Sequence, residues 1–189
     1  MTRRPSRSLA ALALSLPLAL GLAACGSGGS DTSAPSASAS ALTPVDTLIN
    51  SGLRSLQAGD TDVASASFKA ALEIDPKNVF ANYNLGYIAQ MAGQTKQALS
   101  YYDAALATDK TFAAALYNKA YLTETTDLDA AIALYRRALD TAPNNADTHM
   151  RLGFALLHQG KKSEGEKELA AGIKLDPTMK NVTAPTYDN

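Results

Sequence analysis

Apolar residues recur at intervals of three and four positions through most of the chain after residue 43, a pattern that predicts amphipathic helices. In the segment 45–58, for example, apolar side chains on one helical face are Leu48, Ile49, Leu53 and Leu56. Seven more segments show this period: 61–74, 79–91, 96–107, 112–123, 128–140, 146–158 and 163–174. No segment has a credible strand pattern, so the folded part is expected to be all-α.

The residues between these segments are those that begin and end helices. Thr43 is a favourable N-cap, and Pro44 is favourable as a first helical residue. Gly59, Gly93 and Gly160 each follow a helical segment, as expected for residues that end helices. The pattern therefore predicts helices joined by short turns.

Four consecutive segments, of 34, 34, 33 and 34 residues, share the same order of residue types. Each has a small residue, an aromatic residue or leucine, and a second small residue at fixed offsets, and three of the four end with proline. The four sets are Ala64, Phe68, Ala71 and Pro76; Ala98, Tyr102, Ala105 and Lys110; Ala131, Tyr135, Ala138 and Pro143; and Gly165, Leu169, Gly172 and Pro177. Self-similarity at this period indicates helix pairs stacked into a solenoid, which directs the question of function to binding rather than catalysis.

A second series of small residues predicts where the two helices of each pair lie closest. It consists of Gly52, Gly86, Ala120 and Gly153, and it is expected to face Ala64, Ala98, Ala131 and Gly165. Small side chains on both helices permit a short distance between the helix axes.

The repeat resembles the tetratricopeptide repeat (TPR). Leu85-Gly86, Leu152-Gly153 and the two series above fall on the signature of that family, and Lys110 is a departure at a proline position. The resemblance implies an all-α, right-handed α-solenoid of four TPR helix-turn-helix repeats after a disordered linker. The expected TPR domain is 43–179, with repeats at about 45–78, 79–112, 113–145 and 146–179 and a C-terminal tail at 180–189.

The N-terminus has the pattern of an export signal. Three arginines precede an apolar run at residues 9–22, which is short for a membrane span and is followed by Leu22-Ala23-Ala24-Cys25. These four residues resemble the lipobox of bacterial lipoproteins, which implies a lipoprotein signal peptide at 1–25 and lipidation of Cys25. The chain is then expected to be exported and lipid-anchored on the extracytoplasmic face of a bacterial membrane. The alternative is an ordinary secretory signal that ends near a cysteine.

Residues 26–42 are mostly Gly, Ser, Ala and Thr, and they are expected to form a flexible linker. Because residues 1–25 hold three arginines and no acidic residue, the mature chain keeps 14 of the 17 basic residues against 18 acidic ones. This net charge of about −4, without a basic cluster, argues against nucleic-acid binding. Cys25 is the only cysteine, so no disulfide framework is expected.

The TPR resemblance also implies that the first helix of each repeat lines a concave face. The residues expected to form a partner-binding groove there are Phe80, Tyr83, Asn84, Tyr87, Tyr117, Asn118, Tyr121, Met150, Arg151 and Phe154. A surface rich in Tyr and Phe has the composition of a contact surface. The alternative is that some of these aromatic residues only pack between repeats. Tyr83 and Tyr117, which share one position in adjacent repeats, are the best candidates for contact with a partner.

One TPR binding mode holds the C-terminal carboxylate of a partner with lysines, asparagines and an arginine. Asn118 and Arg151 match two of its positions, but Tyr83, Tyr87 and Asp147 stand where Lys, Asn and Lys are needed. The sequence therefore favours a more hydrophobic partner segment, extended or helical.

The expected function is that of a membrane-anchored scaffold, not an enzyme, which binds a protein or peptide partner in the cell envelope. The alternative is a self-associating structural component of an envelope assembly, such as secretion, pilus or cell-wall machinery, without peptide recognition. His149 and His158 lack the spacing of a helical metal pair, and no cofactor is expected. An acidic turn with Glu124, Asp127 and Asp129 allows a divalent ion, although a solvated turn that begins a helix is favoured.

Overall fold

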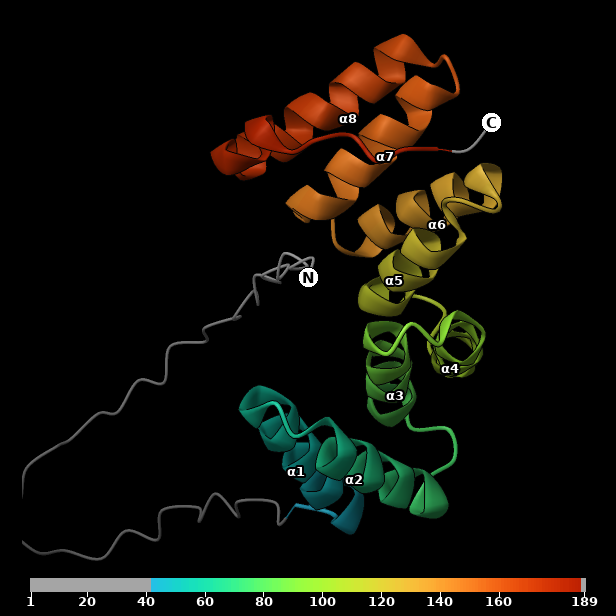
Figure 1. Cartoon of the computed structure of the whole chain (residues 1–189), viewed down its shortest axis with the longest axis vertical. Helices are drawn as coiled ribbons and strands as arrows, with labels where there is room; N and C mark the ends of the chain where they lie inside the picture. Colours follow the sequence, from blue (N-terminus) through green and yellow to red (C-terminus); the bar gives the residue numbers. More distant parts are fainter. Residues whose placement is uncertain (1–41, 188–189) are drawn as a thin grey trace, which may run out of the picture. The chain divides into compact units, whose positions relative to one another are not determined.

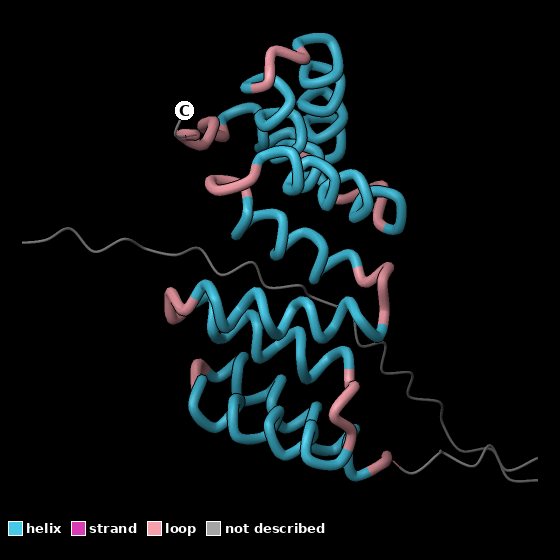
Figure 2. Tube along the Cα trace, turned by 90° about the vertical axis from the view of Figure 1, so that its right-hand side faces the viewer, coloured by secondary structure: helices cyan, strands magenta, loops and turns pink. Residues whose placement is uncertain are grey.

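A computed structural model describes residues 42–187 of the chain, which form a stack of helix pairs (Figure 1). The helices are α1 (Pro44–Ala58), α2 (Thr61–Ile74), α3 (Val79–Met91), α4 (Thr95–Thr108), α5 (Ala113–Thr123), α6 (Leu128–Thr141), α7 (Ala146–His158) and α8 (Lys162–Leu175), followed by the short 3-10 helix η1 (Pro177–Asn181). The described residues contain no strand (Figure 2), so the all-α expectation is confirmed. Cys25 and the expected signal peptide lie outside the described residues.

The first helix shows how local sequence sets the helix ends. The Thr43 hydroxyl accepts a hydrogen bond from the Asp46 backbone N–H, and the Asp46 carboxylate accepts one from the Thr43 N–H, each at 3.1 Å. Two backbone donors of the first turn are thereby satisfied within the helix end. At the other end Gly59 adopts a φ of 84°, and its N–H donates to the Leu56 carbonyl. A residue with a side chain is strained in this conformation, which explains the glycine.

Each first helix packs along the second helix of its own repeat, and each second helix packs on the first helix of the next repeat. The pairs α1/α2, α3/α4, α5/α6 and α7/α8 are therefore layers of one continuous stack, as the period of the sequence predicts. The odd-numbered helices follow one another along one face of this stack.

The large residue of each second helix lies over the small residue of the first helix. Phe68, Tyr102 and Tyr135 are completely buried. A Cβ added to Gly52 would lie 2.6 Å from the Phe68 ring, and one added to Gly86 would lie 2.7 Å from the Tyr102 ring. The recurrent glycine therefore leaves space for the recurrent ring.

In the last repeat two glycines also bring the helix backbones together. A Cβ on Gly165 of α8 would lie 2.8 Å from the carbonyl oxygen of Gly153 on α7. The expected close approach of small residues thus occurs at this helix pair.

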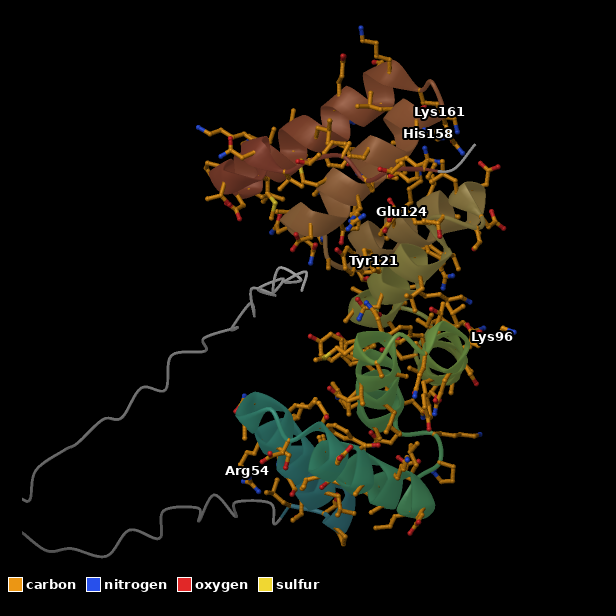
Figure 3. The ribbon with its side chains drawn as sticks, viewed as in Figure 1. Arg54, Lys96, Tyr121, Glu124, His158 and Lys161 are labelled. Atoms are coloured by element: carbon orange, nitrogen blue, oxygen red, sulfur yellow. The ribbon has the colours of Figure 1, made fainter. Side chains whose placement is uncertain are left out.

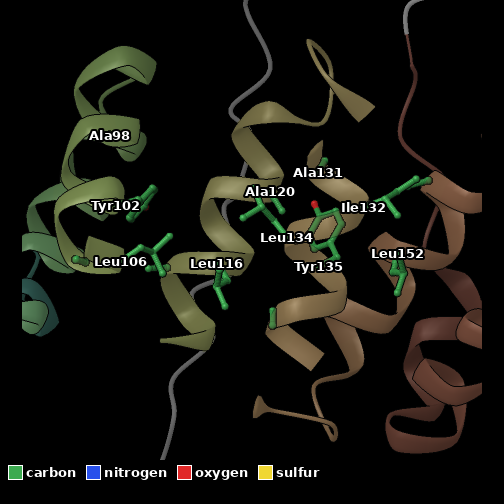
Figure 4. Packing of buried hydrophobic residues seen from close by; sticks show 14 of the residues in the cluster. Ala98, Tyr102, Leu106, Leu116, Ala120, Ala131, Ile132, Leu134, Tyr135 and Leu152 are labelled. Atoms are coloured by element: carbon green, nitrogen blue, oxygen red, sulfur yellow. The ribbon is translucent and has the colours of Figure 1, made fainter. Parts of the chain in front are cut away.

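The buried residues form two hydrophobic clusters. One lies in repeats one and two, around Phe68. The other extends from α3 to α7 and contains the Tyr102 and Tyr135 rings (Figure 4). Because each cluster crosses repeat boundaries, the repeats stabilise one another by nearest-neighbour packing.

Candidate protein-binding groove

The first helices carry three adjoining hollows, which we call the concave groove. The first, of about 380 Å³, lies between α3, α5 and the start of α7 and is lined by Tyr83, Tyr87, Tyr117 and Asn118 among others. The second, of about 170 Å³, includes Tyr117, Met150, Arg151 and Phe154. The third, of about 540 Å³, includes Tyr121, Glu124 and Arg151. Eight of the ten residues that the sequence places in a groove line these hollows, and Met150 is among them although it is only 4% exposed. Phe80 and Asn84, both on α3, line none of the three hollows.

Three aromatic side chains of this face are exposed. Phe80, Tyr87 and Tyr121 retain 56%, 39% and 40% of their accessible surface. The Arg151 guanidinium lies 4.6 Å from the centre of the Tyr121 ring, which is within the range of a cation–π contact. Exposed aromatic area of this kind is available to a partner without rearrangement of the core.

Tyr83 and Tyr117, in contrast, are partly buried and pack against neighbouring aromatic rings. The Tyr83 ring lies 5.2 Å from the Phe112 ring, and the Tyr117 ring lies 5.8 Å from the Tyr135 ring. Burial raises the pKa of both phenols above the ordinary value. The structure therefore gives Tyr87 and Tyr121 more exposed surface in the groove than the two tyrosines favoured from the sequence.

The two asparagines expected in the groove are both buried, and of the two only Asn118 lines a hollow. The Asn84 side-chain N–H donates to the Phe80 carbonyl at 2.7 Å, and the Asn118 side-chain N–H donates to the Tyr83 hydroxyl at 3.4 Å. The side-chain carbonyl of neither asparagine accepts a hydrogen bond from another described residue. Asn118 lines the first hollow, so its carbonyl is placed to accept a hydrogen bond from a peptide N–H.

Glu124, at the end of α5, is a site residue that the sequence analysis placed wrongly. Its side chain is only 3% exposed and is directed away from the acidic turn. One carboxylate oxygen accepts hydrogen bonds from the Tyr135 hydroxyl at 2.9 Å and from Arg151 at 3.3 Å. The other accepts one from the Tyr187 hydroxyl at 2.6 Å. The buried charge is thus paired and hydrogen-bonded, as a buried carboxylate requires.

The charge of Glu124 also changes the ionisation of its neighbours. Burial by itself lowers the pKa of Arg151, but the carboxylate beside it raises that pKa overall. Burial, reinforced by the Glu124 charge, raises the pKa of Tyr135. Arg151 is therefore charged and Tyr135 is a neutral donor over the physiological pH range.

The repeat itself contained a signal for Glu124. Near the end of each first helix, 11 or 12 residues before the large residue of the second helix, the four repeats have Leu56, Gln90, Glu124 and Leu157. The apolar residues accompany Phe68 and Leu169, which have no hydroxyl. The Gln90 side-chain carbonyl accepts a hydrogen bond from the Tyr102 hydroxyl at 2.7 Å, just as the Glu124 carboxylate accepts one from the Tyr135 hydroxyl. An acceptor occurs in this position only in the two repeats whose large residue is a hydroxyl donor.

The segment after η1 occupies part of the concave groove. Val182, Thr183 and Pro185 line the second hollow, and Pro185 and Tyr187 line the third. The sequence alone indicates only a C-terminal tail at residues 180–189. Tyr187, an aromatic residue in this otherwise mostly polar segment, was a sign that the segment makes contacts, but the sequence did not show with which helix.

The histidines have separate surroundings. The His149 ring nitrogens lie 2.6 Å from the Glu168 carboxylate and 2.9 Å from the Pro143 carbonyl, so this side chain joins α7 to α8 and to the preceding turn. The His158 ring, labelled in Figure 3, has its centre 4.7 Å from the centre of the Tyr187 ring, and the two ring planes are tilted by 39°. Asp127 caps α6 by accepting a hydrogen bond from the Ala130 N–H at 2.9 Å. Residues 42–187 hold no group of three or more His, Cys, Asp or Glu placed to bind a metal.

None of the described helices is both long enough and apolar enough to cross a membrane.

Comparison with known sequences identifies the repeat. Four sequence models, each described as a tetratricopeptide repeat, match residues 45–78, 67–100, 88–146 and 122–182. Together they cover all eight α-helices of the described residues. The chain therefore belongs to the tetratricopeptide-repeat proteins, as its residue pattern indicated. No curated protein matches the chain.

Solved structures share the fold. The structure of pilF from Pseudomonas aeruginosa is 27% identical, with a TM-score of 0.64 over 72% of this chain and 64% of that chain. A crystal structure of MamA is 22% identical, with a TM-score of 0.62 over 73% of this chain and 81% of that chain. MamA from Desulfovibrio magneticus RS-1 is 23% identical, with a TM-score of 0.60 over 72% and 77% of the two chains. These similarities confirm the α-solenoid.

Proposed function

We propose that this chain is a lipid-anchored scaffold of a bacterial cell envelope that binds a protein partner in its concave groove. The observation that carries the proposal is the set of exposed aromatic side chains, Phe80, Tyr87 and Tyr121, beside the hollows of the first helices. Aromatic residues dominate protein interfaces because they bury a large area at low cost in conformational entropy.

The chemistry of the groove favours an apolar or aromatic partner segment. The floor supplies the Asn118 carbonyl for a backbone N–H, while Tyr87 and Tyr121 supply apolar walls. Arg151 is already paired with Glu124, so it is not a free charge for a partner carboxylate. A segment that is extended or helical and largely uncharged fits these groups best.

The anchor is proposed from residues 1–25. The apolar run and Leu22-Ala23-Ala24-Cys25 support lipidation of Cys25. Two or more acyl chains hold a protein stably at a membrane, whereas one does so only reversibly. The linker of residues 26–42 would then separate the repeats from the lipid surface.

The proposal is tested by affinity capture from detergent-solubilised envelope of the bacterium that makes this protein. The full chain is compared with a Tyr87→Ala, Tyr121→Ala double variant, and recovered proteins are measured by quantitative mass spectrometry. We expect the partner to be recovered at least about tenfold less by the double variant, because a hot-spot residue contributes 2 kcal/mol or more.

Ile74→Ala with Leu175→Ala is the matched control. These side chains are similarly exposed but lie on the second helices α2 and α8. The control should recover the partner within about twofold of the unchanged chain. Equal recovery by the groove variant would reject the groove as the binding surface. Separately, Cys25→Ser should move the protein from the membrane to the soluble fraction, and retention at the membrane would reject the anchor.

A further inference from the structure

The segment after α8 follows the groove that the proposed function assigns to a partner. From η1 it runs along α7 and reaches the end of α5, where it ends the described residues (Figure 1). Val182 and Pro185 line the second hollow together with Met150, Arg151 and Phe154. The C-terminal half of the groove therefore holds a peptide segment that belongs to the chain itself.

Tyr187 is the anchor of this segment. Its hydroxyl donates to the buried Glu124 carboxylate at 2.6 Å, and its ring stacks on His158. This is a charge-assisted hydrogen bond to a carboxylate that is almost completely removed from solvent. Tyr121 and Glu124, which are labelled with His158 in Figure 3, line the third hollow together with Tyr187.

The rest of the segment is held weakly. Val182 donates a backbone hydrogen bond within η1, to Met179. From residue 183 to residue 186, the structure shows no hydrogen bond to any other described residue. A segment with one strong anchor and otherwise apolar contacts is bound in the manner of a peptide ligand rather than as part of the solenoid core.

We propose that residues 182–187 are a built-in competitor of the partner, and that the partner presents the same chemistry. That chemistry is an extended segment with a tyrosine two residues after a proline, the tyrosine hydroxyl being donated to Glu124. This inference rests on the proposed function, since it names what the C-terminal half of the groove binds. A segment with a tyrosine at this place satisfies the carboxylate oxygen that Tyr187 now satisfies, whereas one with a phenylalanine leaves it without that donor.

Competition within one chain has a measurable consequence. A short tether gives the attached segment an effective concentration in the millimolar range. A free peptide must displace it, so the apparent affinity falls by the fraction of molecules in which the groove is open. Removal of the Tyr187 side chain from the protein should therefore tighten the binding of a free peptide.

The experiment uses a fluorescent synthetic peptide with the sequence of residues 180–189. It is titrated by fluorescence anisotropy with the full chain in detergent and with the full chain carrying Tyr187→Ala. We expect saturable binding to the Tyr187→Ala chain that is at least about tenfold tighter than to the unchanged chain. A peptide with Tyr187→Phe should bind at least about tenfold more weakly than the parent peptide, because it lacks the donor for Glu124.

Matched controls separate the hydroxyl from general contact. A Thr186→Ala peptide should bind like the parent, since Thr186 is exposed. A Tyr187→Phe chain keeps the aromatic ring and loses only the hydroxyl, so it should also bind the peptide more tightly than the unchanged chain does. Circular dichroism should show unchanged helicity in both substituted chains.

Two results would overturn the inference: absence of peptide binding by a folded Tyr187→Ala chain, and equal binding of the Tyr and Phe peptides. A third is a dimer, seen by light scattering, that Tyr187→Ala dissociates, because the segment would then bind a second copy. Tyr121 lines the same hollow as Tyr187, so partner capture is repeated with Tyr87→Ala alone, because Tyr87 lines only the first hollow and reports on the proposed function without the Tyr187 site. Failure of the peptide experiment with that capture intact would reject only this inference.

Discussion

The two halves of the concave groove are built from the same repeat but differ in what they leave open. Over α3 the aromatic side chains Phe80 and Tyr87 are exposed, and the hydroxyl of the buried Tyr102 meets the neutral Gln90. Over α7 the chain's own segment covers the groove, and the hydroxyl of Tyr135 meets the charged Glu124.

A single position explains much of this difference. Gln90 and Glu124 are equivalent in the repeat, but a buried carboxylate requires more donors than an amide carbonyl does. Glu124 obtains them from Tyr135, Arg151 and Tyr187. Glu124 thus joins its own repeat to α7 and to the segment after η1, whereas Gln90 bonds only within its own repeat.

The largest expected effect comes from comparing a buried ring, Tyr135, with an exposed ring, Phe80, in their contribution to stability. Tyr135→Ala removes a completely buried side chain and should lower the free energy of unfolding by about 3–5 kcal/mol. Phe80→Ala removes an aromatic residue that is mostly exposed and should cost less than about 1 kcal/mol. Urea denaturation followed by circular dichroism measures both. Similar losses would mean that the open half of the groove is part of the core.

The next effect compares the two hydroxyl pairs directly. Tyr135→Phe leaves a buried carboxylate with one donor fewer and should cost about 1.5–3 kcal/mol. Tyr102→Phe removes a bond to a neutral amide and should cost about 0.5–1.5 kcal/mol. The same denaturation experiment distinguishes them, because both variants keep the ring in place. A larger loss for Tyr102→Phe would contradict the role given to the charge of Glu124.

The smallest effect concerns the helix crossings. Repeat two has Ala98 where repeat four has Gly165, and a methyl group on Gly165 would lie 2.8 Å from the Gly153 carbonyl. Overpacking lowers the free energy of unfolding by about 1–3 kcal/mol, and the better helix propensity of alanine offsets about 1 kcal/mol of that loss. We therefore expect Gly165→Ala to destabilise by about 1 kcal/mol.

Glu166→Ala, at the exposed neighbouring position of α8, is the control for Gly165→Ala and should change stability by no more than about 0.5 kcal/mol. Thermal unfolding of both variants checks the pair. Stabilisation by Gly165→Ala would show that α7 and α8 separate readily, and the close approach would then not constrain this repeat.

Much of the fold could be predicted because its determinants are local. The period of 33 or 34 residues, the apolar faces and the residues at helix ends placed the eight α-helices to within a residue or two. Repeat proteins favour such prediction, since each unit contacts only its neighbours. The helix face on which each aromatic residue of the first helices lies could be predicted for the same reason, because helical spacing determines it.

The tertiary structure decided what the sequence pattern could not. Periodicity places Tyr83 and Tyr87 on one face, but in the structure Tyr83 packs against the rings of Tyr102 and Phe112 whereas Tyr87 stays exposed. The turn at Glu124 reads as acidic and solvated, although its side chain is buried beneath residues 27 and 63 positions further along the chain.

By itself, the sequence determined an all-α tetratricopeptide solenoid and the helix faces that carry its aromatic residues, because helical period and helix ends depend on neighbouring residues. The filling of one such face by Tyr187 depended on a contact between distant segments. No local pattern encodes such a contact, since it forms only when the solenoid has brought α5, α7 and the chain after η1 together.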